Sequence, residues 1–131
     1  MSTFKADYII ARQEEIAGNT SSIPVKTVVN GTAKAWVNFN GTGTIAFRAS
    51  FNATSLSDLG VGIYAVNYTN ALLDANYSFV GGGCRSGADV PQIVGLGYNT
   101  TAPTTTSTRF NTIEYTSTLA DPAYVLVTVN R

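Results

Sequence analysis

The sequence predicts an all-β domain, an antiparallel β-sandwich or jelly roll of about eight short strands that follows a short N-terminal arm. Three observations lead to this fold class. The chain has 131 residues, which is the size of one domain with one core. From residue 23 onward, apolar and polar positions alternate in short runs rich in Val, Ile, Thr, Tyr and Phe. Gly and Asn separate these runs, and alternation between such breaks is typical of half-buried strands.

The arm is predicted at residues 1–22 and the β-domain at residues 23–131. Phe4, Tyr8 and Ile10 alternate with Lys5 and Asp7, which favours an extended start. We interpret residues 1–22 as an attachment arm in which Phe4, Tyr8 and Ile10 contact a larger particle. A short helix, or a first strand of the same sandwich, is the alternative.

Eight segments of the β-domain have the strand pattern. They are residues 23–29, 33–39, 44–51, 62–69, 76–81, 92–98, 108–117 and 123–130. Eight short strands with turn residues between them imply a sandwich or a jelly roll.

The segment Asn40-Gly41-Thr42-Gly43 predicts a hairpin. A three-residue loop over 41–43, with Gly43 in the left-handed region, closes the turn. The resulting register pairs Phe39 with Ile45, Val37 with Phe47 and Ala35 with Ala49 on the core face, and Asn38 with Ala46 and Trp36 with Arg48 on the other face.

Trp36 therefore points away from the main core, opposite Arg48, with which it can form a cation–π pair. A lone Trp on a polar face is either shielded by another strand or buried at a subunit contact, and aromatic residues and Arg concentrate at interfaces. We take Trp36 and Arg48 as candidate subunit-interface residues.

The last segment alternates Val125, Val127 and Val129 with Tyr124, Leu126 and Thr128. Both faces are fairly apolar, which predicts a strand that is central in the sheet or covered on both sides.

The composition excludes most familiar catalytic sites. The chain has no His and one Cys, so the commonest general base and the commonest zinc ligand are absent. Lys plus Arg equals Asp plus Glu at 8 each, which leaves no basic excess for nucleic acid. We expect no enzyme activity, no cofactor and no metal. Charged residues make up only 12% of the chain, and an uncharged polar surface suits packing against other chains.

Two Gly- or Thr-rich stretches, residues 81–87 and 99–106, are predicted surface loops. The Gly triplet is not followed by the Lys-Ser/Thr pair of a phosphate-binding loop. Asp58, Asp74 and Asp121 occur in turn-like contexts, where short side chains bond to backbone amides. Cys84 in its Gly-rich stretch has no His to activate it.

No apolar run approaches the ~20 residues of a membrane span, and the first residues lack the apolar stretch of a signal peptide. We expect a protein made in a cytoplasm, without membrane insertion.

Residues 30–52 resemble a module of tailed-bacteriophage virion proteins, especially tail-fibre-like proteins of marine and cyanobacterial phages. The stretch Lys-Ala-Trp-Val-Asn-Phe-Asn-Gly-Thr-Gly at 34–43 carries the likeness, which continues through 62–69 and 73–77. The resemblance implies a virion surface protein assembled in the host cytoplasm, commonly a homotrimer, that acts as a tail fibre or appendage or as capsid decoration. Its implied partners are other capsid or tail proteins and a host-surface glycan, and it implies no catalytic residue.

Two other classes remain open from the sequence. A carbohydrate-binding module would stack exposed Trp36, Tyr64, Tyr98 or Tyr115 on sugar rings. A carboxylate-dependent hydrolase would need two carboxyl groups that converge in one cleft.

Overall fold

The computed structural model describes residues 8–10, 22–87, 90–97 and 101–131. By its internal contacts the chain divides into two units, Met1–Thr32 and Ala33–Arg131. Each unit is described by itself.

The first unit contains a two-stranded ladder and a short helix. β1 (Tyr8–Ile10) pairs antiparallel with β2 (Ser22–Pro24), and α1 (Val25–Gly31) follows directly. The strand that we predicted over residues 23–29 is therefore wrong beyond Pro24. Val25, Val28 and Val29 have the i, i+3, i+4 spacing that places side chains on one side of a helix, although no residue of α1 is buried.

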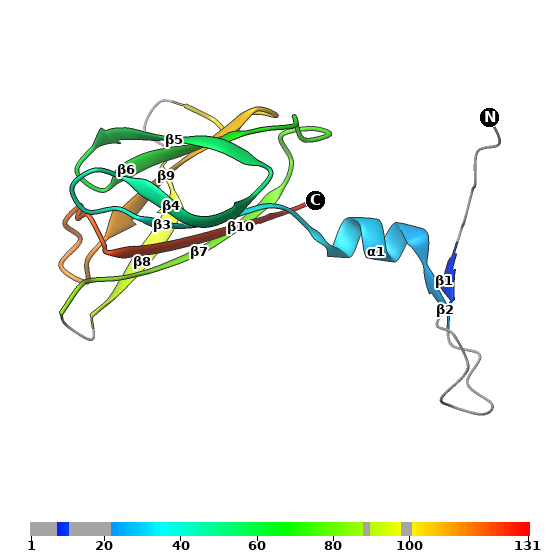
Figure 1. The fold of residues 1–131 in the computed structure, drawn as a ribbon, viewed down its shortest axis with the longest axis horizontal. Helices are drawn as coiled ribbons and strands as arrows, with labels where there is room; N and C mark the ends of the chain where they lie inside the picture. The colour runs from blue at the N-terminus through cyan, green and yellow to red at the C-terminus, as the bar shows by residue number, and fades with distance from the viewer. Residues whose placement is uncertain (1–7, 11–21, 88–89, 98–100) are drawn as a thin grey trace. The chain divides into compact units, whose positions relative to one another are not determined.

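In the second unit, eight of the described strands form one antiparallel sheet, which confirms the all-β fold class. The strands are β3 (Ala33–Asn40), β4 (Ala46–Phe51), β5 (Ala53–Gly60), β6 (Ile63–Tyr68), β7 (Ser78–Cys84), β8 (Pro91–Leu96), β9 (Ser107–Ile113) and β10 (Tyr124–Asn130). Their order across the sheet is β4-β3-β10-β7-β8-β9-β6-β5. The two edge strands, β4 and β5, also contact each other, so the sheet is nearly closed around one interior (Figure 1).

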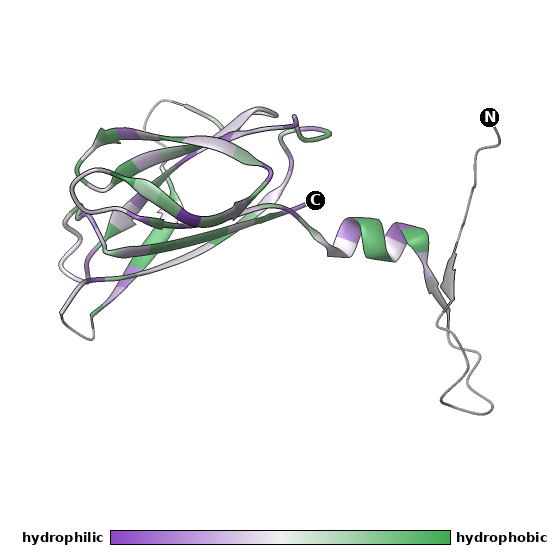
Figure 2. Ribbon diagram, in the orientation of Figure 1, coloured by the Kyte–Doolittle hydropathy of each residue, from purple (hydrophilic) through white to green (hydrophobic). Residues whose placement is uncertain are grey.

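The core fills this interior with side chains from alternate positions of the strands. Phe39, Tyr64, Phe110 and Val125 have no exposed surface. The ring of Phe39 meets that of Tyr64 edge to face at 5.3 Å, a favourable arrangement for aromatic pairs. Hydrophobic and hydrophilic positions alternate along several strands (Figure 2), as expected when only one side of a sheet faces the core.

Asn52 forms the corner between the two edge strands. Its φ of 53° lies in the left-handed region, which Asn tolerates better than most residues. Its amide nitrogen donates to Lys34 O at 3.0 Å and to Asn70 O at 3.1 Å, and its Oδ1 accepts from Asn70 N at 2.8 Å. One side chain thus ties the start of β3 to the end of β6.

A second set of hydrogen bonds joins three turns at the other end of the sheet. Asp121 Oδ1 accepts from Gly62 N at 2.6 Å and from the Tyr64 hydroxyl at 2.7 Å, and that hydroxyl also lies 2.9 Å from Gly41 O. Gly41 N donates to Pro122 O at 3.0 Å. A Cβ on Gly41 would lie 2.7 Å from Pro122 O, so the close approach requires glycine. Burial, followed by the hydrogen bond to Asp121, raises the pKa of Tyr64 far above its usual value.

The hairpin between β3 and β4 differs from the predicted register. Gly43 has the expected left-handed φ of 61°, but the pairs are Asn40 with Ala46, Phe39 with Phe47, Asn38 with Ala49, Val37 with Ser50 and Trp36 with Phe51. The turn is longer than predicted because the Asn40 side chain bonds to Thr42 while Gly41 N bonds outside the hairpin. A bulge opposite Asn38 and Phe39 then shifts the register once more.

The structure differs from our expectation at two further places and agrees with it at β10. β5 was not predicted, because Ser55, Ser57 and Asp58 lower the apolar content of this strand. The surface loop that we predicted over 81–87 is wrong as far as Cys84, where the chain runs in β7. β10 is central, between β3 and β7, as one of our two alternatives predicted, and Val125, Val127 and Val129 are buried. Its outer side is uncovered, since Tyr124 and Leu126 are half exposed.

Candidate functional site

Six large apolar side chains gather on the outer side of the sheet, and we call them the outer patch. They are Trp36, Phe51, Val80, Ile93, Tyr124 and Leu126, and between 39% (Trp36) and 65% (Ile93) of each side chain is exposed. They come from β3, β4, β7, β8 and β10, which are neighbours in the sheet.

The strand register places these six side chains beside one another. In one row across the sheet Phe51 lies opposite Trp36, Trp36 opposite Thr128, and Thr128 opposite Val80. In the next row Leu126 lies opposite Gly82, and Gly82 opposite Ile93. Because residues two apart along a strand point to the same side, the patch is one contiguous surface.

Gly82 of β7 leaves the centre of this surface without a side chain. A Cβ on Gly82 would meet nothing within 4 Å, so this position opens outward between Leu126 and Ile93. A Cβ on neighbouring Gly81 would instead lie 2.7 Å from Val94 Cγ1 in the interior. Gly81 thus allows Val94 to pack closely against β7 in the interior. Gly82 leaves the backbone of β7 uncovered by a side chain on the outer side of the sheet.

The patch is nearly free of charge. The five strands that carry it contain two charged residues, Lys34 and Arg48, and no acidic residue. The Arg48 guanidinium lies 4.1 Å from the centroid of the Tyr124 ring, a cation–π contact. The Oδ1 atom of Asn38 on β3 is buried without a hydrogen-bond partner.

The structure places the predicted interface pair differently from our expectation. Trp36 does point outward, but its cross-strand neighbour is Phe51, and Arg48 stacks on Tyr124. Both predicted residues belong to or touch the outer patch. Sequence reasoning missed Val80 and Ile93, since each is a lone exposed aliphatic residue until the order of the strands brings them together.

The other predicted site residues give no shared site. Phe4 lies outside the described residues, as do the side chains of Tyr8 and Ile10 in β1. Of the aromatic residues considered for sugar stacking, Tyr64 is fully buried, Tyr98 lies outside the described residues, and Tyr115 is 80% exposed.

The carboxylates in the described part of the chain all take part in structural contacts. Asp58 accepts from Gly60 N, and Asp121 accepts from Gly62 N. Asp74 pairs with Arg131 and accepts from Asn76 N, and both contacts lower the pKa of this partly exposed carboxyl. Glu114 lies 3.0 Å from Arg85 and 3.5 Å from the amide of Gln92. Among the residues with a defined placement, no three His, Cys, Asp or Glu side chains gather as a metal site would need.

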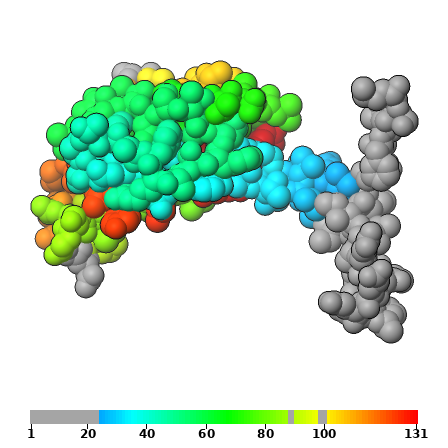
Figure 3. All heavy atoms as spheres, viewed as in Figure 1, coloured from blue at the N-terminus to red at the C-terminus, as the bar shows by residue number. Residues whose placement is uncertain are grey.

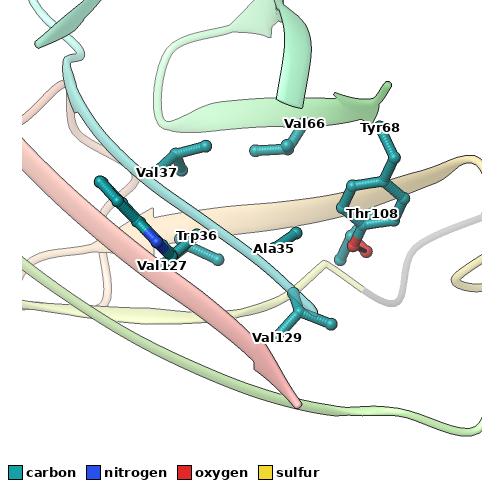
Figure 4. Close-up of a pocket in the computed structure, with 8 residues that line it drawn as sticks. All are labelled: Ala35, Trp36, Val37, Val66, Tyr68, Thr108, Val127 and Val129. Carbon is teal, nitrogen blue, oxygen red and sulfur yellow. Dashed lines mark hydrogen bonds between the residues drawn. The ribbon is translucent and has the colours of Figure 1, made fainter. Parts of the chain in front are cut away.

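A small cavity lies inside the sheet between β3, β6, β9 and β10 (Figure 4). Its volume is about 10 Å³, close to the smallest space that holds one water molecule. Tyr68 and Thr108, which line it, are joined by a hydrogen bond between their hydroxyls. Burial is the main cause that raises the pKa of Tyr68 well above its usual value. This cavity is a packing gap, too small for a ligand.

The face of the Ala33–Arg131 unit that Figure 3 shows is covered by side chains without a deep hollow. In the part of the chain that the structure describes, no helix is long and apolar enough to cross a membrane. No family model, curated protein or solved structure matches the chain.

Proposed function

We propose that this chain is a non-enzymatic structural protein of a bacteriophage virion, a surface-exposed β-domain that associates with copies of itself. The outer patch carries this proposal. Soluble monomers rarely expose a contiguous apolar surface of more than a few hundred Å², and a patch spread over five strands is characteristic of a surface that another protein covers.

The distribution of polar groups supports a structural role over a catalytic one. Asp58, Asp74, Glu114 and Asp121 each hold a turn or pair with Arg. Glycoside hydrolysis needs two carboxyl groups that face one substrate across a few ångströms, and these four are engaged elsewhere. The low charge of the chain, 12%, also lowers the cost of desolvating its surface on assembly.

The virion assignment rests on the resemblance of residues 30–80 to the phage module. In the fold, these residues include β3, β4, β5 and β6. The proposed location is the surface of the particle, as a tail appendage or as capsid decoration, and residues 1–22 are proposed to attach the domain to it. Many linked copies on one particle would strengthen weak contacts through effective concentration.

The test is the solution mass of the purified chain, measured by light scattering after size exclusion. The proposal expects a homotrimer, with a mass about three times 13.8 kDa. A monomer at every concentration up to the solubility limit would contradict self-association, and with it the structural role proposed here.

A further inference from the structure

We infer that the outer patch is the surface on which a second copy of this chain docks. The inference rests on the proposed function and specifies which residues of the self-associating domain touch. It commits further to how they meet: one half of the patch on one copy packs against the other half on the next copy.

The area of the patch sets how much surface the contacts between copies can bury. From the exposed fractions, its six side chains present roughly 600 Å² of apolar surface, since a large aromatic residue contributes 150–250 Å² when fully covered. The exposed backbone around Gly82 and the side chain of Thr128 add to this figure. Each contact uses one half of the patch, roughly 300 Å² on each partner, which is less than the ~800 Å² that a standard interface buries. In a closed ring every copy makes two such contacts and buries its whole patch with its margin, so closure of the ring stabilises the assembly.

The charge distribution fits a copy of the same chain better than an acidic or basic partner. Across the five strands, Lys34 and Arg48 are the charged residues, and Arg48 is stacked on Tyr124. A charged partner would leave its own charges desolvated against apolar side chains, which is costly. A second apolar patch of the same kind carries no such cost.

The two halves of the patch have complementary shapes. The aromatic half, on β3, β4 and β10, consists of Trp36, Phe51 and Tyr124. The glycine half, on β7 and β8, consists of Val80 and Ile93 on either side of Gly82, with nothing above the Cβ position of Gly82. Leu126 of β10 lies between the two halves, opposite Gly82. Bulky rings on one copy fit the low surface of the other, whereas two aromatic halves would meet ring against ring and leave the glycine halves open.

A contact between unlike halves is heterologous if each half binds a different copy. Such contacts form closed rings when the rotation between copies closes. A single patch on each chain is therefore enough to form a ring of copies. Assembly of the ring requires both the aromatic half and the glycine half.

Two charge substitutions test the halves, and a third serves as the matched control. Val80→Glu places a carboxylate in the glycine half, Phe51→Glu places one in the aromatic half, and Val61→Glu makes the same change in the turn between β5 and β6. Val80 and Val61 are about equally exposed, at 63% and 61%, so the two valine variants add the same charge at equally exposed sites, one in a strand of the patch and one in a turn away from it. Light scattering after size exclusion measures the mass of each variant at the concentration where the wild type is assembled.

We expect Val80→Glu and Phe51→Glu to be folded monomers, by circular dichroism, and Val61→Glu to keep the wild-type mass. Mixing the first two variants in equal amounts, at the highest concentration at which both are soluble, should give a complex of two chains, because each still has one intact half of opposite kind. A mixture that stays monomeric overturns the pairing of unlike halves. If both patch variants keep the wild-type mass, the outer patch is not the contact between copies. If the wild type is itself a monomer, the proposed function is contradicted.

If Val80→Glu does not fold, Gly82→Glu takes its place. The Cβ at this position meets nothing within 4 Å, so the isolated domain has room for the new side chain. The same masses are expected, and an assembled Gly82→Glu variant would overturn the inference.

Discussion

Asp121→Ala is expected to destabilise the domain more than any other loss of a single carboxylate that the structure describes. The substitution removes the acceptor for Gly62 N and for the Tyr64 hydroxyl, at 2.6 and 2.7 Å. The hydroxyl keeps Gly41 O as an acceptor, but Gly62 is buried and its N–H loses its partner. Hydrogen bonds to charged groups contribute about 1.5–3 kcal/mol each, so the free energy of unfolding should fall by about 3 kcal/mol.

The assay is urea unfolding followed by far-UV circular dichroism at fixed protein concentration, because assembly makes stability depend on concentration. For a domain of this size, 3 kcal/mol corresponds to a fall in Tm of roughly 10–20 °C. Asp58→Ala is the matched control. Asp58 is exposed and accepts one bond, from Gly60 N at 3.1 Å, so its loss should cost about 0.5–1 kcal/mol. Equal effects of the two substitutions would refute the idea that Asp121 joins the three turns.

Three further predictions concern the interior and the Asn52 corner. Gly81→Ala should cost about 1–3 kcal/mol of stability, because its Cβ would lie 2.7 Å from a valine methyl group, whereas Gly82→Ala should be neutral within about 0.5 kcal/mol; equal urea midpoints would contradict this. Tyr64 and Tyr68 have raised pKa values in the folded state, so their contribution to stability is complete below about pH 10 and falls above it. The free energy of unfolding should fall by about 1.4 kcal/mol per pH unit for each tyrosine. Urea unfolding curves that do not change up to about pH 11 would contradict this prediction. Asn52→Ala should lower the free energy of unfolding by about 2–3 kcal/mol, because it removes three hydrogen bonds and leaves Ala at a positive φ. If thermal unfolding shows a decrease no larger than that caused by replacing an exposed Asn, Asn52 does not hold the corner between β4 and β5.

Local alternation predicted much of the sheet correctly. The positions of β3, β6 and β10, the outward direction of Trp36 and the buried valines of β10 follow from a period of two residues. Gly43 in the left-handed region follows from the hairpin rule. These features depend on residues close together in the sequence, which is why they can be predicted from the sequence.

The missed features depend on contacts between distant segments. Considered without their neighbours in space, Gly81 and Gly82 indicate a loop, because Gly is depleted in strands. Pairing with β8 and β10 makes this segment a strand. The hairpin register depends on Pro122, which accepts the bond from Gly41 N. The outer patch itself exists only because β10 and β7 lie between β3 and β8, and no local pattern of residues specifies that order.

The emission of Trp36 offers the most direct test that copies meet at the outer patch. Trp36 is the only tryptophan in the sequence and its side chain is 39% exposed, so its fluorescence reports on this surface alone. Emission maximum and acrylamide quenching would be measured for the wild type in its assembled form and for monomeric Val80→Glu. The account predicts a shorter emission wavelength and weaker quenching in the assembled wild type. The same emission and quenching in both forms would contradict it, because Trp36 would then remain open to water in the assembly.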